Sequence, residues 1–391
     1  MKKKVAFVVQ RYGLEVNGGS ELSCRLIAEQ LKDHYDIDII TTKAIDYVTW
    51  ANHYTKDIEQ INGITVKRFE TEFPRNQREF SKINENLFGK KYRDINDELK
   101  WMEAQGPASY KLLEYLKTSH KQYEKIVFFT YLYFTTFHGL QQVPEKSILI
   151  PTAHDEPYIY LSMFQSLFNL PKYLLFLTEE EKEFVHKTFK NQHIPNDVVG
   201  LGIDIPNDYL SEEQFRRQFN IEEPFIVYVG RIDESKGCKE LIEYFLKYKK
   251  YNKNNPIKLV MVGKSVMDLP KDSSIISLGF VSEEEKFGAI KSSELLVMPS
   301  KFESFSIALL EGMYLEKPVL VNGHCDVLVG HCKRGNAGLY YTNYAEFEYC
   351  LNLISGNKSL GSGLGKNGHK YVVDNYQWEN IIDKFISAIE S

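Results

Sequence analysis

Residues 225–248 read FIVYVGRIDESKGCKELIEYFLKY and contain the clearest structural pattern in the chain. Five apolar residues come first, Gly230 follows, and an amphipathic run of helical length begins within the next few residues. A strand that is apolar on both faces is typical of a parallel sheet covered by helices. This stretch therefore predicts a strand, a turn and a helix of an α/β domain.

The same pattern recurs in two series along the chain, and each series predicts one parallel sheet. The expected strands of the first series are Val5–Val9, Ile37–Thr41, Ile64–Phe69, Ile126–Thr130, Ile148–Ile150 and Leu174–Thr178. Those of the second are Phe225–Val229, Ile257–Val262, Ile275–Leu278, Leu295–Met298, Val319–Val321 and Leu339–Tyr341. The clearest helices are expected at Ser20–Lys32, Lys236–Tyr248, Ser282–Lys291, Ser306–Tyr314 and Glu379–Ile389. We predict domains at 1–203 and 204–375, with a C-terminal helix at 376–391 that packs back onto the first domain.

Length and composition agree with two globular domains and narrow the class of protein. The chain has 391 residues, of which 43% are hydrophobic and 26% charged, and its formal net charge of -5 lacks the basic excess of a nucleic-acid binder. We see no apolar stretch long enough to span a bilayer. An odd count of five cysteines without a CxxC pair indicates reduced thiols. We expect a cytoplasmic protein with no nucleic-acid partner.

One segment, residues 72–107, does not fit the alternation of strands and helices. Basic and aromatic side chains alternate over residues 73–93. Such a mixture is typical of a solvated helical insertion with buried aromatic residues, which is the interpretation that we favour. The alternative is a peripheral contact with anionic lipid at the inner face of the membrane, or with an acidic acceptor.

Residues that follow the strands are the candidates for a site, because open α/β sheets bind ligands at the carboxyl ends of their strands. After the first strand, residues 10–21 read QRYGLEVNGGSE. Gly18 and Gly19 at a helix start would let a phosphate approach backbone N–H groups. The spacing is not GxGxxG, which argues against a nicotinamide site, and a simple tight turn explains the glycine pair equally well.

The first strand of the second domain is followed by Arg231 and Lys236, which are separated by four residues and lie before a helix. Arginine offers a planar fork to phosphate oxygens and lysine a compact charge, so the two cations could neutralise a diphosphate. The alternative is a surface salt bridge from Arg231 to Asp233 or Glu234.

Residues 298–313, MPSKFESFSIALLEGM, place Glu303 before a helix and Glu311 two turns inside it. Both carboxylates can then approach one ligand, and a carboxylate accepts hydrogen bonds from vicinal sugar hydroxyls. Glu311 could instead be an exposed helix charge, but its apolar neighbours Leu309, Leu310 and Met313 favour a sequestered side chain.

Taken in order, these three motifs resemble the retaining glycosyltransferases of family four. The resemblance covers essentially the whole chain and implies the GT-B fold, in which two Rossmann-like domains face each other across a cleft. It implies that Arg231 and Lys236 hold the donor diphosphate, with help from the backbone of Gly18 or Gly19. The other implied donor contacts are Glu303 with the hexose, the backbone of Ser304, Phe305 and Ser306 with sugar and phosphate, Glu311 with ribose hydroxyls, and Phe280 with the nucleobase. His154 matches a family histidine that orients the sugar and stabilises charge at the reacting carbon.

Residues 323–332, GHCDVLVGHC, bring His324, Cys325, His331 and Cys332 together in the sequence. The spacing is not the CxxC rhythm of structural zinc, so buried thiols beside the cleft are the favoured interpretation over metal binding. The commoner family pattern has a Gly-rich turn and a glutamate near this point, and the chain departs from it here.

The resemblance implies a function as well as a fold. We expect transfer of a hexose or deoxyhexose from a nucleotide-diphosphate sugar to a glycan or lipid-linked glycan, with retention of the anomeric configuration. The departing phosphate would accept the acceptor's proton. We expect no metal and no cofactor, because Arg231, Lys236 and a helix end supply the positive charge and no Asp-x-Asp pair is expected to hold a divalent ion. The alternatives are a sugar-nucleotide epimerase of the same fold and a catalytically silent partner subunit of another transferase.

Overall fold

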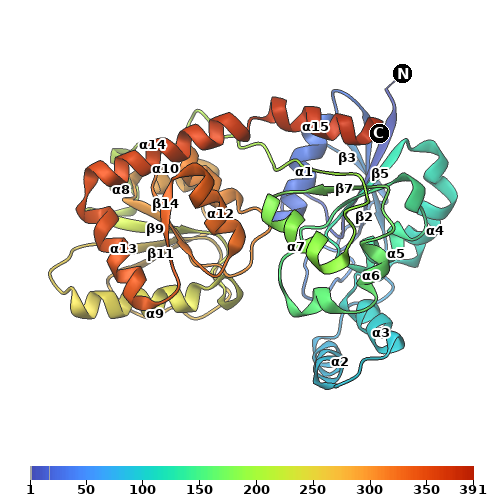
Figure 1. Ribbon diagram of the computed structural model, residues 1–391, viewed down its shortest axis with the longest axis horizontal. Coiled ribbons are helices and arrows are strands. Elements are labelled where there is room, and N and C mark those ends of the chain that lie inside the picture. The colour runs from blue at the N-terminus through green and yellow to red at the C-terminus, as the bar shows by residue number, and fades with distance from the viewer. Residues whose placement is uncertain (1, 17) are drawn as a thin grey trace. The chain divides into compact units, whose positions relative to one another are not determined.

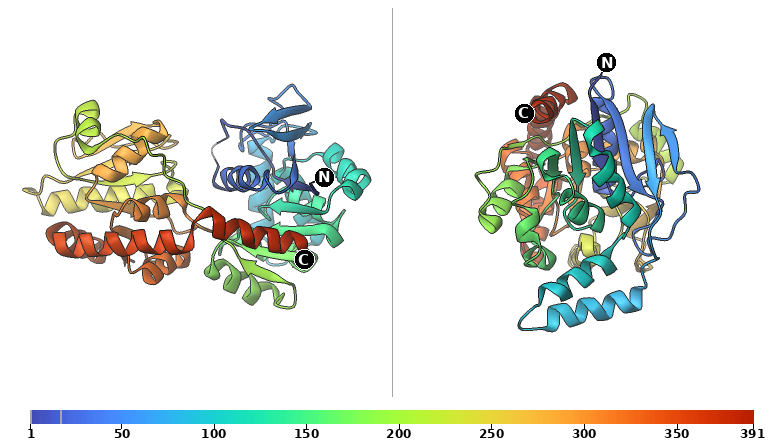
Figure 2. Two further views of the ribbon diagram at one scale, coloured as in Figure 1. Left: turned by 90° about the horizontal axis from the view of Figure 1, so that it is seen from above. Right: turned by 90° about the vertical axis from the view of Figure 1, so that its right-hand side faces the viewer.

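A computed structural model describes residues 2–16 and 18–391, and the chain divides into two compact units. Unit 1 comprises Met1–Leu201 and Trp378–Ser391, and unit 2 comprises Gly202–Gln377 (Figure 1). The chain passes from unit 1 to unit 2 after residue 201 and returns after residue 377, whereas the boundaries expected from the sequence follow residues 203 and 375. Helix α15 (Trp378–Glu390) contacts α1 (Gly19–Leu31) within unit 1, and the Lys3 Nζ atom lies 2.6 Å from Glu390 Oε2 (Figure 2).

Unit 1 is built on an eight-stranded sheet with the order β3-β4-β2-β1-β5-β6-β7-β8. Its strands are β1 (Lys4–Val8), β2 (Asp36–Thr42), β3 (Ile58–Ile61), β4 (Ile64–Phe69), β5 (Lys125–Phe129), β6 (Ser147–Ile150), β7 (Tyr173–Phe176) and β8 (Asn196–Val198). All six predicted strands are present, and the strands β1, β2, β5 and β6 are almost wholly buried, as the apolar runs indicated.

The first sheet is parallel, as predicted, except at one edge, where a strand that was not predicted is added. Strand β3 pairs antiparallel with β4 through a two-residue turn, in which Asn62 has φ 50° and Gly63 has φ 82°. Asn-Gly is the pair that most favours such a hairpin, because both turn residues need positive φ. The sequence therefore carried the signal for β3, whereas the three-residue strand β8 carried none.

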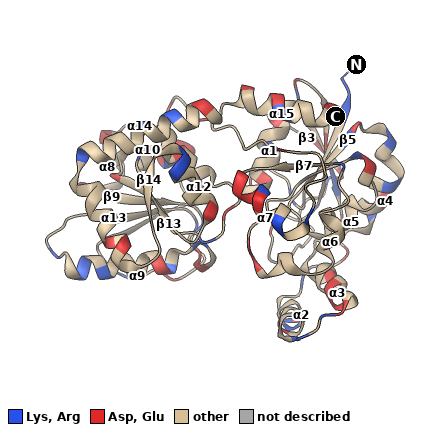
Figure 3. Ribbon diagram, in the orientation of Figure 1, with Lys and Arg blue, Asp and Glu red and all other residues tan. Residues whose placement is uncertain are grey.

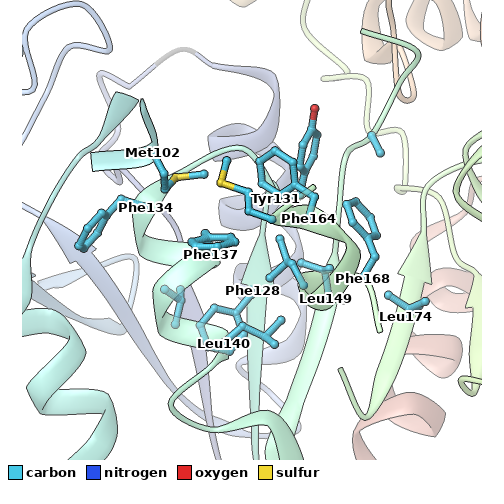
Figure 4. Close-up of a cluster of buried hydrophobic side chains, with 14 of the residues drawn as sticks. Met102, Phe128, Tyr131, Phe134, Phe137, Leu140, Leu149, Phe164, Phe168 and Leu174 are labelled. Atoms are coloured by element: carbon cyan, nitrogen blue, oxygen red, sulfur yellow. The ribbon is translucent and has the colours of Figure 1, made fainter. Parts of the chain in front are cut away.

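Helices cover the sheet of unit 1 and complete its core. They are α1, α2 (Gln77–Gly89), α3 (Ile95–Gln105), α4 (Tyr110–Ser119), α5 (Phe134–Leu140), α6 (Phe164–Leu167), α7 (Glu179–Phe189) and α15. Figure 4 shows side chains of β5, β6 and β7 packed against those of α3, α5 and α6 in one buried cluster. This packing holds the carboxyl end of β6 rigidly, which matters because the predicted site residue His154 follows that strand.

The segment 72–107 forms the helical insertion that we favoured, but only part of its aromatic content is buried. Helices α2 and α3 pack against each other and project from one end of unit 1 (Figure 1; Figure 2, right). Trp101 is buried, whereas Phe73 is 43% and Tyr92 is 82% exposed. The expectation of buried aromatic residues is therefore wrong for Phe73, which lies just before α2, and for Tyr92, which lies between the two helices.

Unit 2 has a six-stranded, all-parallel sheet with the order β11-β10-β9-β12-β13-β14. Its strands are β9 (Phe225–Val229), β10 (Lys258–Val262), β11 (Ile275–Gly279), β12 (Leu295–Met298), β13 (Val319–Asn322) and β14 (Gly338–Tyr341). Its helices are α8 (Glu212–Phe219), α9 (Cys238–Tyr251), α10 (Glu283–Ser292), α11 (Ile307–Tyr314), α12 (Asp326–Gly335), α13 (Tyr344–Gly356) and α14 (Lys358–Asn375). The six strands and three helices predicted for this unit are confirmed to within a few residues.

Charged residues of both signs are interspersed along the helices of each unit (Figure 3). Helix α10 illustrates how the sequence sets a helix start, because Ser282 and Glu285 form a reciprocal capping box. Across residues 2–16 and 18–391, no helix is long and apolar enough to cross a membrane.

Candidate functional site

The strand order of unit 2 reverses at β9, which lies between β10 and β12. In such sheets the loops that leave the two strands at the reversal part to opposite sides and open a crevice for a ligand. Here those loops are residues 230–237 after β9 and residues 299–306 after β12. Two of the three sequence motifs thus lie side by side at the point where the topology predicts a site.

Close backbone contact holds the two loops together. Gly237 has φ 76°, and a Cβ atom on it would lie 2.3 Å from the carbonyl oxygen of Pro299. Only glycine fits this position, since both the left-handed conformation and the contact exclude a side chain. The contact brings Lys236 and Glu303 together, and the Lys236 Nζ atom lies 2.8 Å from Glu303 Oε1.

Arg231 lies in the same loop as Lys236 but makes a different contact. Its Nε atom lies 3.0 Å from Asp233 Oδ2, and its side chain is 39% exposed. This is the ion pair that the alternative interpretation expected for Arg231. A partly exposed pair of this kind contributes at most about 1 kcal/mol, so it leaves the guanidinium able to exchange its partner for a phosphate.

The residues Ser304, Phe305 and Ser306 lead into helix α11. Ser306 has φ 69°, an uncommon conformation for a residue with a side chain, and it is only 9% exposed. Its Oγ atom is buried and has no hydrogen-bond partner among the described residues. A buried hydroxyl next to the first amides of a helix has the chemistry that an anionic or sugar ligand requires.

Glu311 is buried inside α11, as its apolar neighbours indicated, and it is paired. Lys286 of α10 places its Nζ atom 2.9 Å from Glu311 Oε1 and 2.6 Å from Glu283 Oε2. Burial raises the pKa of Glu311, and the Lys286 ammonium opposes that shift. Burial acts to lower the pKa of Lys286, but the carboxylates of Glu311 and Glu283 outweigh it and raise the pKa.

Phe280 follows β11 directly and is 72% exposed. The exposed ring offers a flat apolar face to a ligand. Exposure alone does not assign Phe280 a partner, so its contact with a nucleobase stays a prediction.

His331 belongs to the segment that we considered for metal binding, but it holds the loop of Glu303 instead. Its Nε2 atom lies 3.0 Å from the carbonyl oxygen of Phe305, and its Nδ1 atom lies 3.1 Å from the Tyr371 hydroxyl. Burial lowers the pKa of His331 to about 3, so the ring is neutral at physiological pH. A carbonyl only accepts hydrogen bonds, so Nε2 carries the proton and Nδ1 accepts from Tyr371.

The neighbouring cysteines, Cys325 and Cys332, are buried thiols. Burial raises the pKa of Cys325 to about 11 and that of Cys332 to about 12. Within the described part of the chain, no group of three or more His, Cys, Asp or Glu side chains is arranged to hold a metal ion.

One Asp-x-Asp triplet does occur, at Asp36–Asp38, but it lies at the amino-terminal start of β2. Asp38 Oδ2 accepts hydrogen bonds from Lys67 at 2.7 Å and from the Tyr123 hydroxyl at 2.6 Å. The Asp38 carboxylate is thus used in hydrogen bonds within unit 1. It lies near the amino-terminal end of β2, whereas ligands of such sheets bind at the carboxyl ends of the strands.

In unit 1, Gly18 and Gly19 lie at the start of α1, and Asn17 of the same motif lies outside the described residues. A Cβ atom on Gly18 would lie 2.0 Å from Glu21 Oε2, whereas one on Gly19 would meet nothing within 4 Å. Glu21 in turn accepts a 2.8 Å hydrogen bond from Arg11 Nε. A carboxylate of the chain itself thus covers Gly18, and Gly19 is the more open of the two glycines.

His154 follows β6 and lies beside two carboxylates of unit 1. Its Nε2 atom lies 3.5 Å from Glu156 Oε2, and the Tyr131 hydroxyl donates to the other oxygen of Glu156 at 2.7 Å. The buried Glu181 accepts the backbone N–H of Ala153 at 2.6 Å, and burial raises its pKa to about 8. These contacts fix the backbone and the side-chain partner of His154.

The structure therefore sorts the predicted site residues into two groups. Unit 2 holds Arg231, Lys236, Phe280, Glu303, Ser304, Phe305, Ser306 and Glu311, and unit 1 holds Gly18, Gly19 and His154. The sequence did not predict three contacts around these residues, namely those of Lys286 with Glu311, of Arg11 with Glu21, and of Glu181 with the backbone of Ala153. Arg11 had a usable signal, because it follows the first strand directly, whereas Lys286 and Glu181 lie inside charged helix faces that look solvated.

Comparison with known proteins adds sequence evidence. Residues 211–347 match the family model described as Glycosyl transferases group 1. The uncharacterized glycosyltransferase MJ1607 of Methanocaldococcus jannaschii is 24% identical over 407 aligned residues, which cover 98% of this chain and 97% of that protein.

Solved structures show the same fold at low identity. Sucrose-phosphate synthase from Thermosynechococcus elongatus matches with a TM-score of 0.73 and 15% identity, covering 100% of this chain and 98% of that one. Anabaena Alr3699/HepE, solved in complex with UDP and glucose, matches with a TM-score of 0.69 and 14% identity over 99% of both chains. The whole chain thus has the GT-B fold of these solved structures, and its residues 211–347 match the group 1 glycosyltransferase model.

Proposed function

We propose that this chain is a glycosyltransferase that moves a hexose or deoxyhexose from a nucleotide-diphosphate sugar to a glycan or lipid-linked glycan. The observation that carries the proposal is the 2.8 Å pairing of Lys236 with Glu303 at the reversal point of the sheet. A lysine that can bind phosphate thus lies beside a carboxylate that can hold sugar hydroxyls, and Arg231 lies in the same loop, which supports the proposal. The complex of Anabaena HepE with UDP and glucose supports a donor of this class.

We further propose that the transfer retains the anomeric configuration and needs no metal ion. The bond between the anomeric carbon and the β-phosphate oxygen breaks, and the acceptor oxygen bonds to the same face of that carbon. The acceptor's proton passes to the departing phosphate, so that a glycoside and a nucleoside diphosphate result. Arg231, Lys236 and the amides at the start of α11 stabilise the departing charge. The proposal also includes the predicted roles of three residues of unit 1: His154 orients the donor sugar, and the backbone of Gly18 or Gly19 contacts the diphosphate.

Thermal unfolding with a panel of UDP-, GDP- and dTDP-sugars tests donor binding. We expect at least one donor to raise the melting temperature of the wild type, and both Arg231→Ala and Lys236→Ala to remove that rise. Lys239→Ala is the matched control, because Lys239 lies in the first turn of α9, and within the described ranges its ion pair is with the exposed Glu234 at 3.4 Å. If no nucleotide sugar stabilises the wild type, the proposal fails.

The stereochemistry and the metal requirement are tested on the active enzyme. NMR of the product formed with the donor identified above should show the donor's anomeric configuration, and excess EDTA should leave the rate unchanged. An inverted product, or activity that EDTA abolishes and Mg²⁺ restores, contradicts the respective part of the proposal.

A peripheral membrane contact through residues 73–93 stays a prediction with a direct test. Phe73 and Tyr92 are exposed, and Lys91 lies within 5.7 Å of the Tyr92 ring centre. Sedimentation with vesicles of anionic phospholipid should carry down the wild type more than Tyr92→Ala or Lys91→Glu. Equal sedimentation of all three proteins assigns the α2–α3 hairpin a purely structural role.

A further inference from the structure

The buried contact between Lys286 and Glu311 was not expected from the sequence, and it joins two helices at the carboxyl end of the unit 2 sheet. Lys286 lies one turn inside α10, and Glu311 lies in α11. The exposed fractions of their side chains are 16% and 9%, and the Nζ to Oε1 distance is 2.9 Å. The third member, Glu283, is 70% exposed and lies 2.6 Å from the same ammonium group.

Burial makes this ion pair unlike the surface pairs of the chain. Removing two charges from water is costly, and a single unpaired charge left inside is costlier still. Ordinary stability does not require such a pair, because apolar side chains of similar volume would fill the same space at least as well. A buried pair at a ligand-binding edge therefore calls for a role in binding.

The two oxygens of Glu311 are not equivalent. Lys286 donates to Oε1, and no described residue donates to Oε2. An ionised carboxylate has only acceptor sites, so a hydroxyl group can donate to Oε2 while Lys286 keeps Oε1. The donor of the proposed function is a nucleotide-diphosphate sugar, and the vicinal hydroxyls of its ribose are groups of this kind.

We propose that Lys286 is a positioning residue for ribose recognition, which holds Glu311 by one oxygen so that the other accepts a ribose hydroxyl. The proposal rests on the proposed function, and it narrows the donor to ribonucleoside diphosphate sugars over their 2′-deoxy counterparts. Lys286 acts only through Glu311, so the diphosphate itself does not depend on it.

Isothermal titration of full-length protein with three kinds of probe tests this. The probes are UDP and GDP, their 2′-deoxy forms, and inorganic pyrophosphate, which has phosphates but no ribose. We expect the wild type to bind one ribonucleotide about 10-fold more tightly than its 2′-deoxy form, since a site built for a hydroxyl rejects the analogue that lacks it. Lys286→Met should weaken ribonucleotide binding about 10-fold and remove this preference, with pyrophosphate binding unchanged.

Two further variants make the result specific. Lys291→Met, on the same helix, is the matched control. It should bind all probes as the wild type does, because the hydrogen bond of Lys291 among the described residues goes to the carbonyl of Leu315 at 3.4 Å rather than to Glu311. The double variant Lys286→Met, Glu311→Gln should bind no more weakly than Glu311→Gln alone, since both changes remove one interaction. If Lys286→Met does not fold, Lys286→Gln keeps a donor without the charge and should still weaken the ribonucleotide alone.

The outcomes separate this inference from the proposed function. The role of Lys286 is overturned if the Lys286 variants bind with wild-type affinity, or if they lose ribonucleotide and pyrophosphate binding equally. Arg231→Ala and Lys236→Ala should still abolish binding in that case, so the proposed function would stand. A wild type that binds none of the probes, and that no nucleotide sugar stabilises either, overturns the proposed function itself.

Discussion

The neutral imidazole of His331 donates a 3.0 Å hydrogen bond to the carbonyl oxygen of Phe305, two residues beyond Glu303. The other ring nitrogen accepts from Tyr371, whose hydroxyl lies 3.0 Å from that of Tyr376. The Tyr376 carbonyl in turn accepts the backbone N–H of Ile203 at 2.9 Å. The loop that carries Glu303 is thus fastened to both segments at which the chain enters and leaves unit 2.

Replacing His331 should loosen this loop. In His331→Ala the carbonyl of Phe305 and the hydroxyl of Tyr371 lose their partner in a buried cavity, which should cost about 2–4 kcal/mol of unfolding free energy. Urea unfolding measures the loss, and hydrogen exchange should speed up in peptides that cover 300–306. The matched control is His369→Ala, whose ring is only half-buried against the Tyr314 carbonyl. Unchanged exchange in the loop would contradict its attachment through His331.

The stability of unit 2 should also depend on pH through His331. Its pKa is about 3 in the folded chain and has the ordinary value of 6.5 when unfolded, so the unfolded chain binds the extra proton between these values. The contribution is complete above pH 6.5 and is lost as the pH falls, by about 1.4 kcal/mol per unit. Urea unfolding at pH 7.5, 6 and 5 gives the unfolding free energy as a function of pH. Between pH 6 and 5 its slope should be smaller in His331→Gln than in the wild type, by the amount that corresponds to one bound proton. Identical slopes for the two proteins would show that His331 titrates normally.

The sequence predicted unit 2 better than unit 1 for a physical reason. Strands β9 and β12 of unit 2 are continuous apolar runs and are neighbours in the sheet. Because the two motif loops follow these strands, chain order and motif spacing were sufficient to bring them together. The β3–β4 hairpin of unit 1 needed its Asn62-Gly63 turn to be read. Contacts such as Lys286 with Glu311 depend on how two helices pack, and no local pattern encodes that distance.

Ser306 should show opposite effects on stability and on binding. Its buried hydroxyl has no partner among the described residues, so Ser306→Ala should keep or raise the unfolding free energy, by up to about 1 kcal/mol. If the hydroxyl meets the donor, as proposed, nucleotide-sugar affinity should fall about 5-fold. Ser300→Ala is the contrasting variant, because it removes the 3.1 Å hydrogen bond to the Phe302 carbonyl and should destabilise. A similar loss of stability in both variants would mean that the Ser306 hydroxyl is satisfied within the protein.

Glu303 should separate binding from catalysis, because it serves as the counter-ion of Lys236 and lies only 13% exposed. Glu303→Gln frees Lys236 from that carboxylate, so nucleoside diphosphate binding should stay the same or become tighter, by up to about 3-fold. The rate of transfer should fall about 100-fold or more, since the amide no longer offers a charged acceptor to the sugar in the transition state. Titration calorimetry with UDP and GDP measures the first effect, and initial rates with saturating donor measure the second. Glu240→Gln is the control, because Glu240 pairs with Lys301 at 3.1 Å on the same side of the unit and should alter neither quantity. Should Glu303→Gln weaken diphosphate binding as strongly as Lys236→Ala does, the carboxylate would belong to the framework of the phosphate site rather than to the sugar.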